Sequence, residues 1–333
     1  MGSEMCIRDS SKTDSPNFPD ILAIGEALIE FVRLDDGDIQ QTQVGKHRPL
    51  YQQGYGGDTS NMLIAAARQK ADCGYVTAVG DDIFGHDLIN LWQQENISTD
   101  YVVVKPEHPT GAYFVQPHAS GRQYTYARRG SAASHYHHDW LPLDALAGAK
   151  AVHASALSLA ISQTMRDSVA SAFDYAKSHN TLVSFDTNLR LNLWDLETAV
   201  ASIERILPLV DVVFPSDDEA RQIIGRDKAD DLIDYFFDFG CRLVVLTRGV
   251  EGAIVATENE RTAIPPAPSK PVDATAAGDS FAGSFLVHYL ETGDTTFAGR
   301  CAAATAAKTV SGLGALDPIP YRDDVLAMVK STS

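Results

Sequence analysis

A regular alternation of apolar segments between residues 151 and 256 constrains the fold of this 333-residue chain more than any other feature. Short β-branched runs alternate there with longer segments of helical periodicity. Strands are expected at 151–155, 181–185, 211–214, 243–247 and 252–256, and helices at 162–178, 197–206, 217–224 and 228–238. Buried strands that alternate with helices form a parallel sheet covered by helices on both faces. The expected fold class is therefore a three-layer α/β fold with a mostly parallel central sheet.

The N-terminal part of the chain predicts a second, smaller sheet. The first strand of the main sheet is expected at 21–25, and residues 28–32 are expected to continue it after a break that holds Glu26. Polar or alternating segments drawn from about 35–55 and 101–130 indicate a small antiparallel sheet, separate from the main one. The main domain would then be built from both ends of the chain, with the small sheet inserted.

The boundaries of the domain and its location in the cell follow from composition. No linker divides the chain, so one domain is expected over residues 20–333. Residues 1–19 are polar and lack the apolar core of a signal peptide, so we expect a disordered tail or a leader foreign to the protein. No apolar run reaches membrane-spanning length. The four cysteines include no CxxC pair, which fits a reducing compartment and predicts a cytoplasmic protein.

Charge and missing motifs exclude several classes of function. Nucleic-acid and membrane-surface binding depend on clustered Lys and Arg, so a net charge of −17 predicts neither partner. The sequence contains no GxxxxGK(S/T), GxGxxG or GxSxG motif, which argues against P-loop, dinucleotide and serine-nucleophile sites. His135, His137 and His138 stand beside Asp139. Because adjacent side chains in a loop point in divergent directions, we expect a solvated loop there and not a metal site.

Residues 272–281, VDATAAGDSF, have the composition of an anion-binding helix start. Small residues precede a helical pattern, so unpaired N–H groups and the positive end of the helix dipole would be open to an anion. Ala276, Ala277 and Gly278 carry no bulk that would keep phosphate oxygens away. Asp279 would lie beside the anion, where a general base for an attacking hydroxyl is needed. From this segment alone, an ordinary N-cap aspartate stays open.

A second glycine-rich segment precedes a helix of small residues. Gly56 and Gly57 would let the backbone approach a ligand closely, and Asn61 can donate to and accept from sugar hydroxyls. Glu26 would lie at the carboxyl end of an inner strand, where open α/β sheets bind ligands. A solvated loop acid is equally compatible with the position of Glu26.

Gly56–Gly57 with Asn61, together with residues 273–279 (DATAAGD), resemble the two signatures of the PfkB (ribokinase-like) carbohydrate kinases. The resemblance covers residues 20–325, including the order of strands and helices. It implies a Rossmann-like core, a β-sheet lid that closes on the sugar, and ATP-dependent phosphorylation of a sugar hydroxyl. It also implies that Asp279 is the catalytic base and that the three residues before it form the anion hole.

The resemblance implies ATP and Mg²⁺ as cofactors and leaves dependence on a monovalent cation open. Ser216 and Glu219 stand where the family has Asn-x-x-Glu, so Glu219 is expected to order Mg²⁺ through water. Adenine is expected against the helix near Ala303. The residues expected to hold the phosphates and ribose of the nucleotide are Ser216, Thr247, Arg248, Gly249, Gly252, Ala276 and Gly278.

Two residues depart from the family pattern. Ala276 replaces glycine, and its methyl group is tolerated without strain only where φ is negative. Ser216 replaces asparagine and shortens one polar side chain near the metal. Neither departure removes the base, so the kinase interpretation holds.

Two arginines indicate the class of sugar. Arg190 follows a predicted strand and would lie at the sugar pocket. The lid residues that would meet it there are Tyr113, Tyr126 and Arg128. Guanidinium groups pair bidentately with carboxylates, so a sugar acid is expected. With this set the chain is most similar to 2-keto-3-deoxygluconate kinases, which form the 6-phosphate, and fructokinases are the alternative because they share the segment 188–194.

The sequence also bears on two other functions and on the oligomeric state. A non-catalytic sugar-binding regulator on the same fold would lack the base or the anion hole, and both are present here. An NAD-dependent oxidoreductase would need the dinucleotide fingerprint, which is missing. Lid sheets of the family often pair between subunits, so the resemblance implies a homodimer or a higher homo-oligomer, and an exposed edge of the small sheet would favour such pairing.

Overall fold

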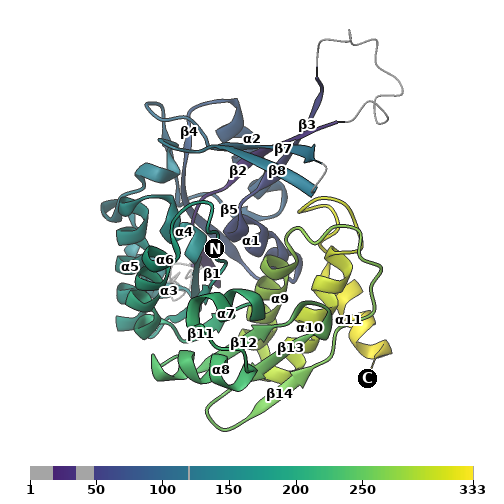
Figure 1. Cartoon of the computed structure of the whole chain (residues 1–333). Coiled ribbons are helices and arrows are strands. Elements are labelled where there is room, and N and C mark those ends of the chain that lie inside the picture. Colours follow the sequence, from purple (N-terminus) through teal and green to yellow (C-terminus); the bar gives the residue numbers. More distant parts are fainter. Residues whose placement is uncertain (1–17, 35–48, 119–120, 333) are drawn as a thin grey trace, which may run out of the picture.

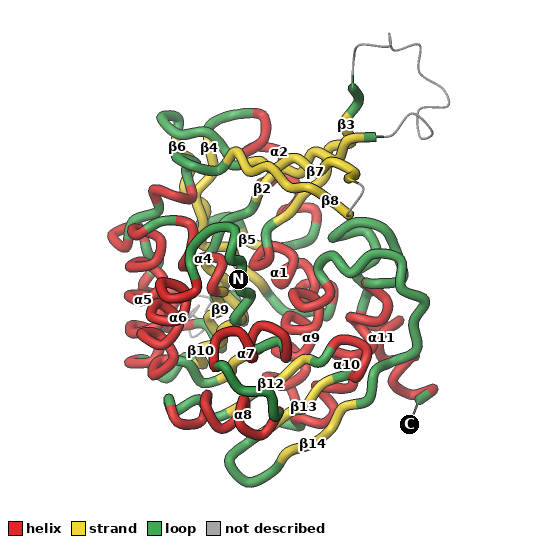
Figure 2. The backbone as a smooth tube through the Cα atoms, viewed as in Figure 1, coloured by secondary structure: helices red, strands yellow, loops and turns green. Residues whose placement is uncertain are grey.

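The computed structural model describes residues 18–34, 49–118 and 121–332. Within these residues a 10-stranded sheet forms the centre of the molecule, in the order β14–β13–β12–β11–β10–β9–β1–β4–β5, with β6 also paired to β4 (Figures 1 and 2). From β12 to β5 the neighbours run parallel, whereas β13 and β14 form an antiparallel edge. The strands are β1 (Ile21–Ile24), β4 (Cys73–Gly80), β5 (Ile97–Ser98), β6 (Val102–Lys105), β9 (Ala151–Ser155), β10 (Leu182–Asp186), β11 (Val212–Phe214), β12 (Leu243–Thr247), β13 (Ala253–Ala256) and β14 (Arg261–Ile264).

Helices cover both faces of this sheet because its strands bury alternate side chains on each face. Val152 and Val183 pack on one side with helices α3 to α8, and Ala151 and Val212 pack on the other with α1, α2, α9 and α10. The predicted three-layer α/β fold is therefore confirmed. The helices are α1 (Asp58–Arg68), α2 (Ile83–Gln94), α3 (Leu143–Gly148), α4 (Ala156–Ile161), α5 (Gln163–Ser178), α6 (Leu196–Ile206), α7 (Asp217–Ile224), α8 (Ala229–Asp238), α9 (Ala277–Thr292), α10 (Thr295–Thr309) and α11 (Arg322–Ser331).

The strands and helices expected between residues 151 and 256 are present, and their ends differ from the predicted ones by at most one residue. Two elements were not predicted from the sequence: α4, which follows β9 directly, and the edge strand β14. Both are short, and α4 continues the apolar run of β9, so periodicity gives no boundary between them.

A separate sheet of four strands lies over one end of the main sheet, in the order β3–β2–β7–β8 (Figure 1). It corrects three predictions. The small sheet is mixed and not antiparallel throughout, because β2 pairs in parallel with β7. Residues 28–32 do not extend the first strand, because β2 leaves the main sheet and pairs with β3 and β7. Residues 101–104 belong to the main sheet, because β6 pairs in parallel with the end of β4. The strands are β2 (Leu28–Arg33), β3 (Tyr51–Gly56), β7 (Ala112–His118) and β8 (Gly121–Ala127).

The N-terminal boundary lies slightly earlier than expected. Phe18 packs against the core, so the packed chain includes residues that the sequence analysis assigned to the leader. Residues 1–17 and 35–48, where the rest of the leader and part of the lid were expected, lie outside the described residues. Among the described residues, no helix has the length and apolar character to cross a membrane.

Close packing of α1 against α9 brings two distant parts of the chain together. A Cβ atom at Gly283 of α9 would lie 2.3 Å from the carbonyl oxygen of Met62 and 3.1 Å from the Cβ of Ala65. Only a glycine allows the two helix backbones to approach this closely. The N-terminal turns of α1 and α9, which are more than 200 residues apart in sequence, therefore face the same cavity.

Candidate active site

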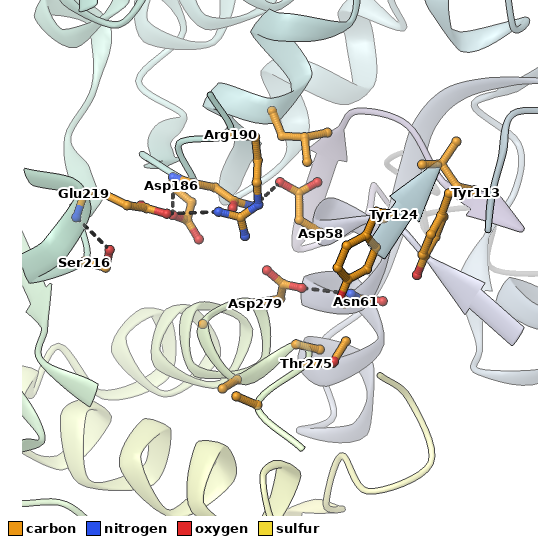
Figure 3. A pocket seen from close by; sticks show the side chains of 18 of the residues that line it. Asp58, Asn61, Tyr113, Tyr124, Asp186, Arg190, Ser216, Glu219, Thr275 and Asp279 are labelled. Carbon is orange, nitrogen blue, oxygen red and sulfur yellow. Dashed lines mark hydrogen bonds and ion pairs between the residues drawn. The ribbon is translucent and has the colours of Figure 1, made fainter. Parts of the chain in front are cut away.

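A cavity of 480 Å³ lies between the small sheet, the N-termini of α1 and α9, and the carboxyl ends of the central strands (Figure 3). Carboxyl ends of parallel strands are where open α/β sheets bind ligands. The sequence-predicted residues that line it are Gly57, Asn61, Tyr113, Tyr126, Arg128, Arg190, Ser216, Glu219, Thr247, Ala276, Ala277, Gly278 and Asp279. Glu26 and Gly56 do not line the cavity, but each contacts a residue that does.

The start of α9 presents an uncapped helix terminus to the cavity. Its N-cap is Ala276, and no side chain of the described residues caps the helix, unlike α2, α6, α7 and α10. The N–H groups of Gly278 and Asp279 lie in the first turn, where no carbonyl of the helix can accept from them. The N–H of Ala277 donates to Ala274 O at 3.2 Å. A Cβ at Gly278 would meet no atom of the described part of the chain within 4 Å, and both Gly278 and Asp279 line the cavity. This terminus has the geometry of an anion site.

Ala276 does not have the negative φ that its methyl group was expected to require. Its φ of 60° and ψ of 13° place it in the left-handed region, where an L-residue other than Gly, Asn or Asp is uncommon. The turn into α9 imposes this conformation on an alanine. Backbone strain is therefore located directly beside the candidate anion site.

Asp279 is the third residue of α9, so it is not the N-cap of the helix. Its Oδ2 accepts a hydrogen bond of 2.8 Å from Asn61 Nδ2 of α1. Burial, together with the nearby charge of Asp58, raises the pKa of the Asp279 carboxyl from 3.8 to about 7. A carboxylate with this pKa can accept a proton from a hydroxyl near neutral pH.

Two acidic residues in the cavity were not predicted. Asp58 is held by a 2.6 Å hydrogen bond from Asn188 Nδ2. Asp186 ends β10, and burial beside Glu219 and Asp279 raises the pKa of its carboxyl well above the usual value. The rule that singled out Glu26, a carboxylate at the carboxyl end of an inner strand, applies equally to Asp186. Other lining residues that were not predicted from the sequence are Leu28, Tyr124, Leu157, Asn188, Asn192, Phe214, Ala274 and Thr275.

Glu219 and Arg190 form an ion pair at the wall of the cavity that carries Asp186. Arg190 Nη1 lies 3.1 Å from Glu219 Oε1, and Thr187 Oγ1 donates to Glu219 Oε2 at 3.2 Å. Ser216 caps α7 and accepts from the N–H of Glu219 at 3.4 Å, which fixes the start of that helix. Asp186 and Glu219 offer the carboxylate oxygens that Mg²⁺ prefers, so the residues present fit this ion. Arg190 therefore lies on the acidic side of the cavity and not on the lid side.

The lid side of the cavity combines tyrosines with one buried arginine. The rings of Tyr113 and Tyr126 lie 5.8 Å apart, and Tyr113 Oη donates to Glu30 at 2.7 Å. Arg128 forms an ion pair with Glu26, whose Oε1 also accepts from Ser131 at 2.5 Å. Glu26 is 1% exposed, so it is a buried partner of Arg128 and not a solvated loop acid.

A second cavity, of 310 Å³, adjoins the first and is mostly apolar. The two cavities share a wall made of Thr247, Ala274, Ala277 and Gly278. The second cavity is lined further by the expected nucleotide residues Gly249, Gly252 and Ala303. Arg248 does not line either cavity, and its guanidinium pairs with Glu251.

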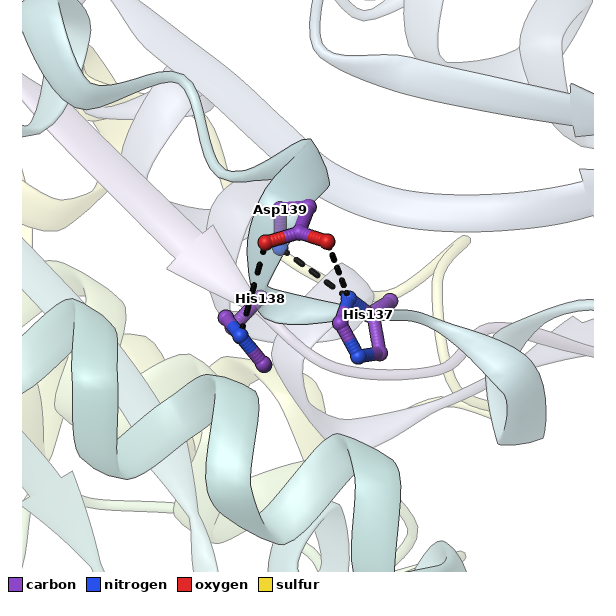
Figure 4. Close-up of side chains that lie close together, drawn as sticks. All are labelled: His137, His138 and Asp139. Carbon is purple, nitrogen blue, oxygen red and sulfur yellow. Dashed lines mark hydrogen bonds and ion pairs between the residues drawn. The ribbon is translucent and has the colours of Figure 1, made fainter.

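Figure 4 shows the side chains of His137, His138 and Asp139. These residues line neither of the two cavities. His137 Nδ1 and His138 Nε2 lie 3.2 and 3.4 Å from the carboxylate of Asp139, and the two rings are 4.0 Å apart. The expectation that these side chains diverge is therefore wrong, because the short 3-10 helix at His138–Trp140 turns them toward one carboxylate. His135 instead stacks on His108, at 3.7 Å between ring centroids.

Comparisons with known proteins agree on one family. The pfkB family carbohydrate kinase profile matches residues 19–322. The 2-dehydro-3-deoxygluconokinase of Thermoproteus tenax is 30% identical over 93% of this chain and 94% of its own length. A probable fructokinase-5 of Arabidopsis thaliana is 29% identical over 95% of this chain and 99% of its own length.

Solved structures give the same picture. A PfkB protein from Polaromonas sp. JS666 has a TM-score of 0.82 and 26% identity, over 93% of this chain and 99% of that one. The fructokinase of Vibrio cholerae O395, solved with fructose, ADP and calcium ion bound, has a TM-score of 0.80 and 25% identity, over 93% of this chain and 98% of that one.

Proposed function

The chain belongs to the pfkB family of carbohydrate kinases, and we propose that it transfers the γ-phosphoryl group of ATP to 2-keto-3-deoxygluconate, giving the 6-phosphate. One observation carries the choice of a sugar acid. Arg128 lines the sugar cavity at 8% exposure, and its Nε has no hydrogen-bond acceptor among the described residues. A buried donor without a partner carries a free-energy penalty, which a bound acceptor removes. The carboxylate of a sugar acid is such an acceptor for a guanidinium.

Asp279 acts as the general base in this proposal. Its hydrogen bond from Asn61 fixes the carboxylate and leaves Oδ1 to accept the proton of the attacking hydroxyl. The N–H groups of Gly278 and Asp279 donate to the phosphoryl group as it is transferred, at the positive end of the α9 dipole. The base and the donors belong to the same helix turn, so the nucleophile and the phosphoryl group are aligned by one rigid element.

Asp186 and Glu219 would hold Mg²⁺, Glu219 through water. When bound, Mg²⁺ neutralises charge on the phosphate oxygens during transfer. Arg190 is paired with Glu219 and lies among four carboxylates, which raise the pKa of its guanidinium, so it keeps its positive charge near the transferred group. Two arginines were expected to pair with the carboxylate of the sugar acid. In this proposal Arg128 alone does so. The apolar second cavity would take the adenine ring beside Ala303.

The alternative is a fructokinase, which the relatives from Arabidopsis thaliana support. Fructose carries no charge, and Glu26 already neutralises Arg128 in part. A neutral sugar could therefore use the same guanidinium through its hydroxyl groups. A non-catalytic sugar-binding regulator is disfavoured, because Asp279 and the uncapped helix terminus face one cavity.

The experiment compares ADP release from Mg·ATP with 2-keto-3-deoxygluconate, gluconate, fructose and ribose, with Asp279→Asn as the blank. Arg128→Lys keeps the charge opposite Glu26 but loses the planar fork. We expect kcat/KM for the keto-deoxy acid to fall about 10- to 100-fold in this variant, since one charge-assisted hydrogen bond of the bidentate pair, worth about 1.5–3 kcal/mol, is lost. Arg129→Ala is the matched control, because Arg129 is the exposed neighbour.

The outcomes separate the alternatives. A preference for fructose that is unchanged in Arg128→Lys would keep the kinase and refute the acid substrate. No turnover with any sugar would support the regulator. Replacing K⁺ by Na⁺ in the same assay tests the monovalent-cation dependence that the family resemblance leaves open.

We further propose a cytoplasmic homodimer. The side chains of residues 123–127 in β8 are exposed, and β8 pairs with β7 alone among the described strands. An edge strand of this kind offers unpaired backbone groups to a second copy. Light scattering of the purified protein tests the assembly, and a monomer at micromolar concentration would refute it.

A further inference from the structure

Arg68, the last residue of α1, is bonded in a way that the proposed chemistry does not explain. Its side chain is 9% exposed. Nε and Nη2 donate to the two carboxylate oxygens of Glu95 at 3.0 and 2.6 Å, and Nη1 donates to the carbonyl oxygens of Leu316 and Ile319, both at 2.7 Å. The guanidinium also lies 5.1 Å from the centre of the Tyr321 ring. One side chain thus ties the end of α2 to the loop of residues 310–320.

This loop in turn holds the segment that leads into α9. The N–H of Gly314 donates to Asp273 Oδ2 at 3.2 Å. The other oxygen of Asp273 accepts from the N–H and the hydroxyl of Thr275, at 3.1 and 2.7 Å. The N–H groups of Val272 and Asp273 both donate to Val310 O, at 2.7 and 3.2 Å. Thr275 directly precedes Ala276, the N-cap of α9, so hydrogen bonds through Asp273 and Thr275 connect the loop to the segment that leads into the candidate anion site.

The two ends of α1 therefore contact, directly or through the 310–320 loop, the two ends of the segment 272–279. Asn61, near the start of the helix, contacts Asp279. Arg68, at its end, fixes the 310–320 loop, and Gln69 adds a 3.1 Å hydrogen bond to Pro320 O. The left-handed turn at Ala276 is strained and needs support from its surroundings to persist. Bonds to Asp273 from the loop supply that support.

We infer that Arg68 is a positioning residue for phosphoryl transfer: it holds the 310–320 loop, which orders Asp273 and through it the N-terminal turn of α9. The inference rests on the proposed kinase function. It predicts that loss of Arg68 misaligns the donors of the anion site, and a misplacement of about 1 Å can lower the rate about 100-fold. Asn61 and Arg128 remain in place, so the apparent affinity for the sugar changes little.

Arg68→Met is the test variant, and Arg68→Lys keeps the charge without the fork that reaches Glu95 and two carbonyls at once. We expect kcat to fall about 10- to 100-fold and KM for ATP to rise in Arg68→Met, with KM for the sugar within about 3-fold of wild type. Arg68→Lys should recover part of the loss. Leu88→Ala, which opens a cavity in α2, is the control for loss of stability and should leave kcat unchanged where it is folded.

We call the path of hydrogen bonds from Arg68 through the 310–320 loop and Asp273 to α9 the relay. Two further measurements distinguish the relay from a merely structural role of Arg68. Combining Arg68→Met with Asp273→Asn should lower kcat little beyond the worse single variant, since both act on one turn. Amide hydrogen exchange in residues 272–280 should be faster in Arg68→Met but not in Leu88→Ala. Losses that multiply, or unchanged exchange in this segment, would overturn the inference.

The exchange measurement also separates this inference from the proposed function. It needs no substrate, so it decides on the relay even if the wild type turns over none of the sugars. If Arg68→Met does not fold, exchange is measured in Arg68→Lys, whose single ammonium cannot reach Glu95 and both loop carbonyls at once. Faster exchange at residues 272–280 in Arg68→Lys supports the relay, and wild-type exchange there refutes it.

Discussion

Replacing Asp279 by Asn is expected to abolish activity and to stabilise the protein. The amide has the shape of the carboxylate and can still accept from Asn61 through its oxygen, so packing is preserved. It cannot accept the hydroxyl proton, and loss of a general base lowers kcat by a factor of about 10² to 10⁴. The gain in stability has an electrostatic origin, because the amide removes a charge that is disfavoured in the folded state.

The gain in stability depends on pH, because the folded and the unfolded protein lose the Asp279 proton at different pH values. The pKa of Asp279 is about 7 in the folded protein, against a usual value of 3.8. Between these values the unfolded chain has lost a proton that the folded chain keeps, so wild-type stability falls as pH rises. Each pKa unit is worth 1.36 kcal/mol, so the full penalty above pH 7 is about 4 kcal/mol. Because Asp279 is partly exposed to the cavity, we expect about 2 kcal/mol.

Urea unfolding of both proteins at pH 4, 6 and 8 measures the difference. The free energies of unfolding should agree at pH 4 and diverge in favour of Asp279→Asn toward pH 8. The kcat/KM of the wild type should fall as pH drops below about 7, because the base becomes protonated. An Asn variant that is less stable than wild type at pH 8, or one that retains activity, would refute the reasoning.

Two other substitutions test the surroundings of the base. Ala276→Gly should raise the free energy of unfolding by about 0.5–1 kcal/mol, since it relieves left-handed strain of about 1–2 kcal/mol and loses part of that to the flexibility of the unfolded chain. Thermal unfolding checks this prediction, and a destabilised variant would contradict it. Gly283→Ala should destabilise by about 1–3 kcal/mol and lower kcat, because the new methyl group meets Met62 O and moves α1 away from α9. A variant with wild-type kcat would show that the Asn61–Asp279 contact does not depend on this packing.

The core of the fold was predictable because its strands are buried on both faces. Continuous apolar runs such as 212–214 and 243–246 leave few alternatives to a parallel sheet between helix layers. The sequence did not predict whether a given strand belongs to the main sheet or to the small sheet. Residues 28–32 and 101–104 have good strand patterns, but a pattern of period 2 does not specify the partner, which is set by where the chain turns.

The site was predictable where chemistry depends on a local segment. Asp279 and Asn61 belong to short signatures, and the structure brings them into contact. Asp58 was missed because an acid next to a glycine looks like an ordinary solvated residue until the cavity is known. Asp186 ends a strand, so the rule that selected Glu26 would also have selected it. The positive φ of Ala276 was also beyond the sequence, since an alanine gives no local signal for a left-handed turn and surrounding bonds impose it.

The wall shared by the two cavities has a consequence for inhibitor design. Thr247, Ala274, Ala277 and Gly278 line both cavities, so a sugar analogue and a nucleotide analogue bound on either side would be separated by little more than small side chains. A short linker could join the two into one bisubstrate molecule. Its second half would then bind at the high effective concentration set by the linker, and its affinity could exceed that of either half by about 10²- to 10⁴-fold.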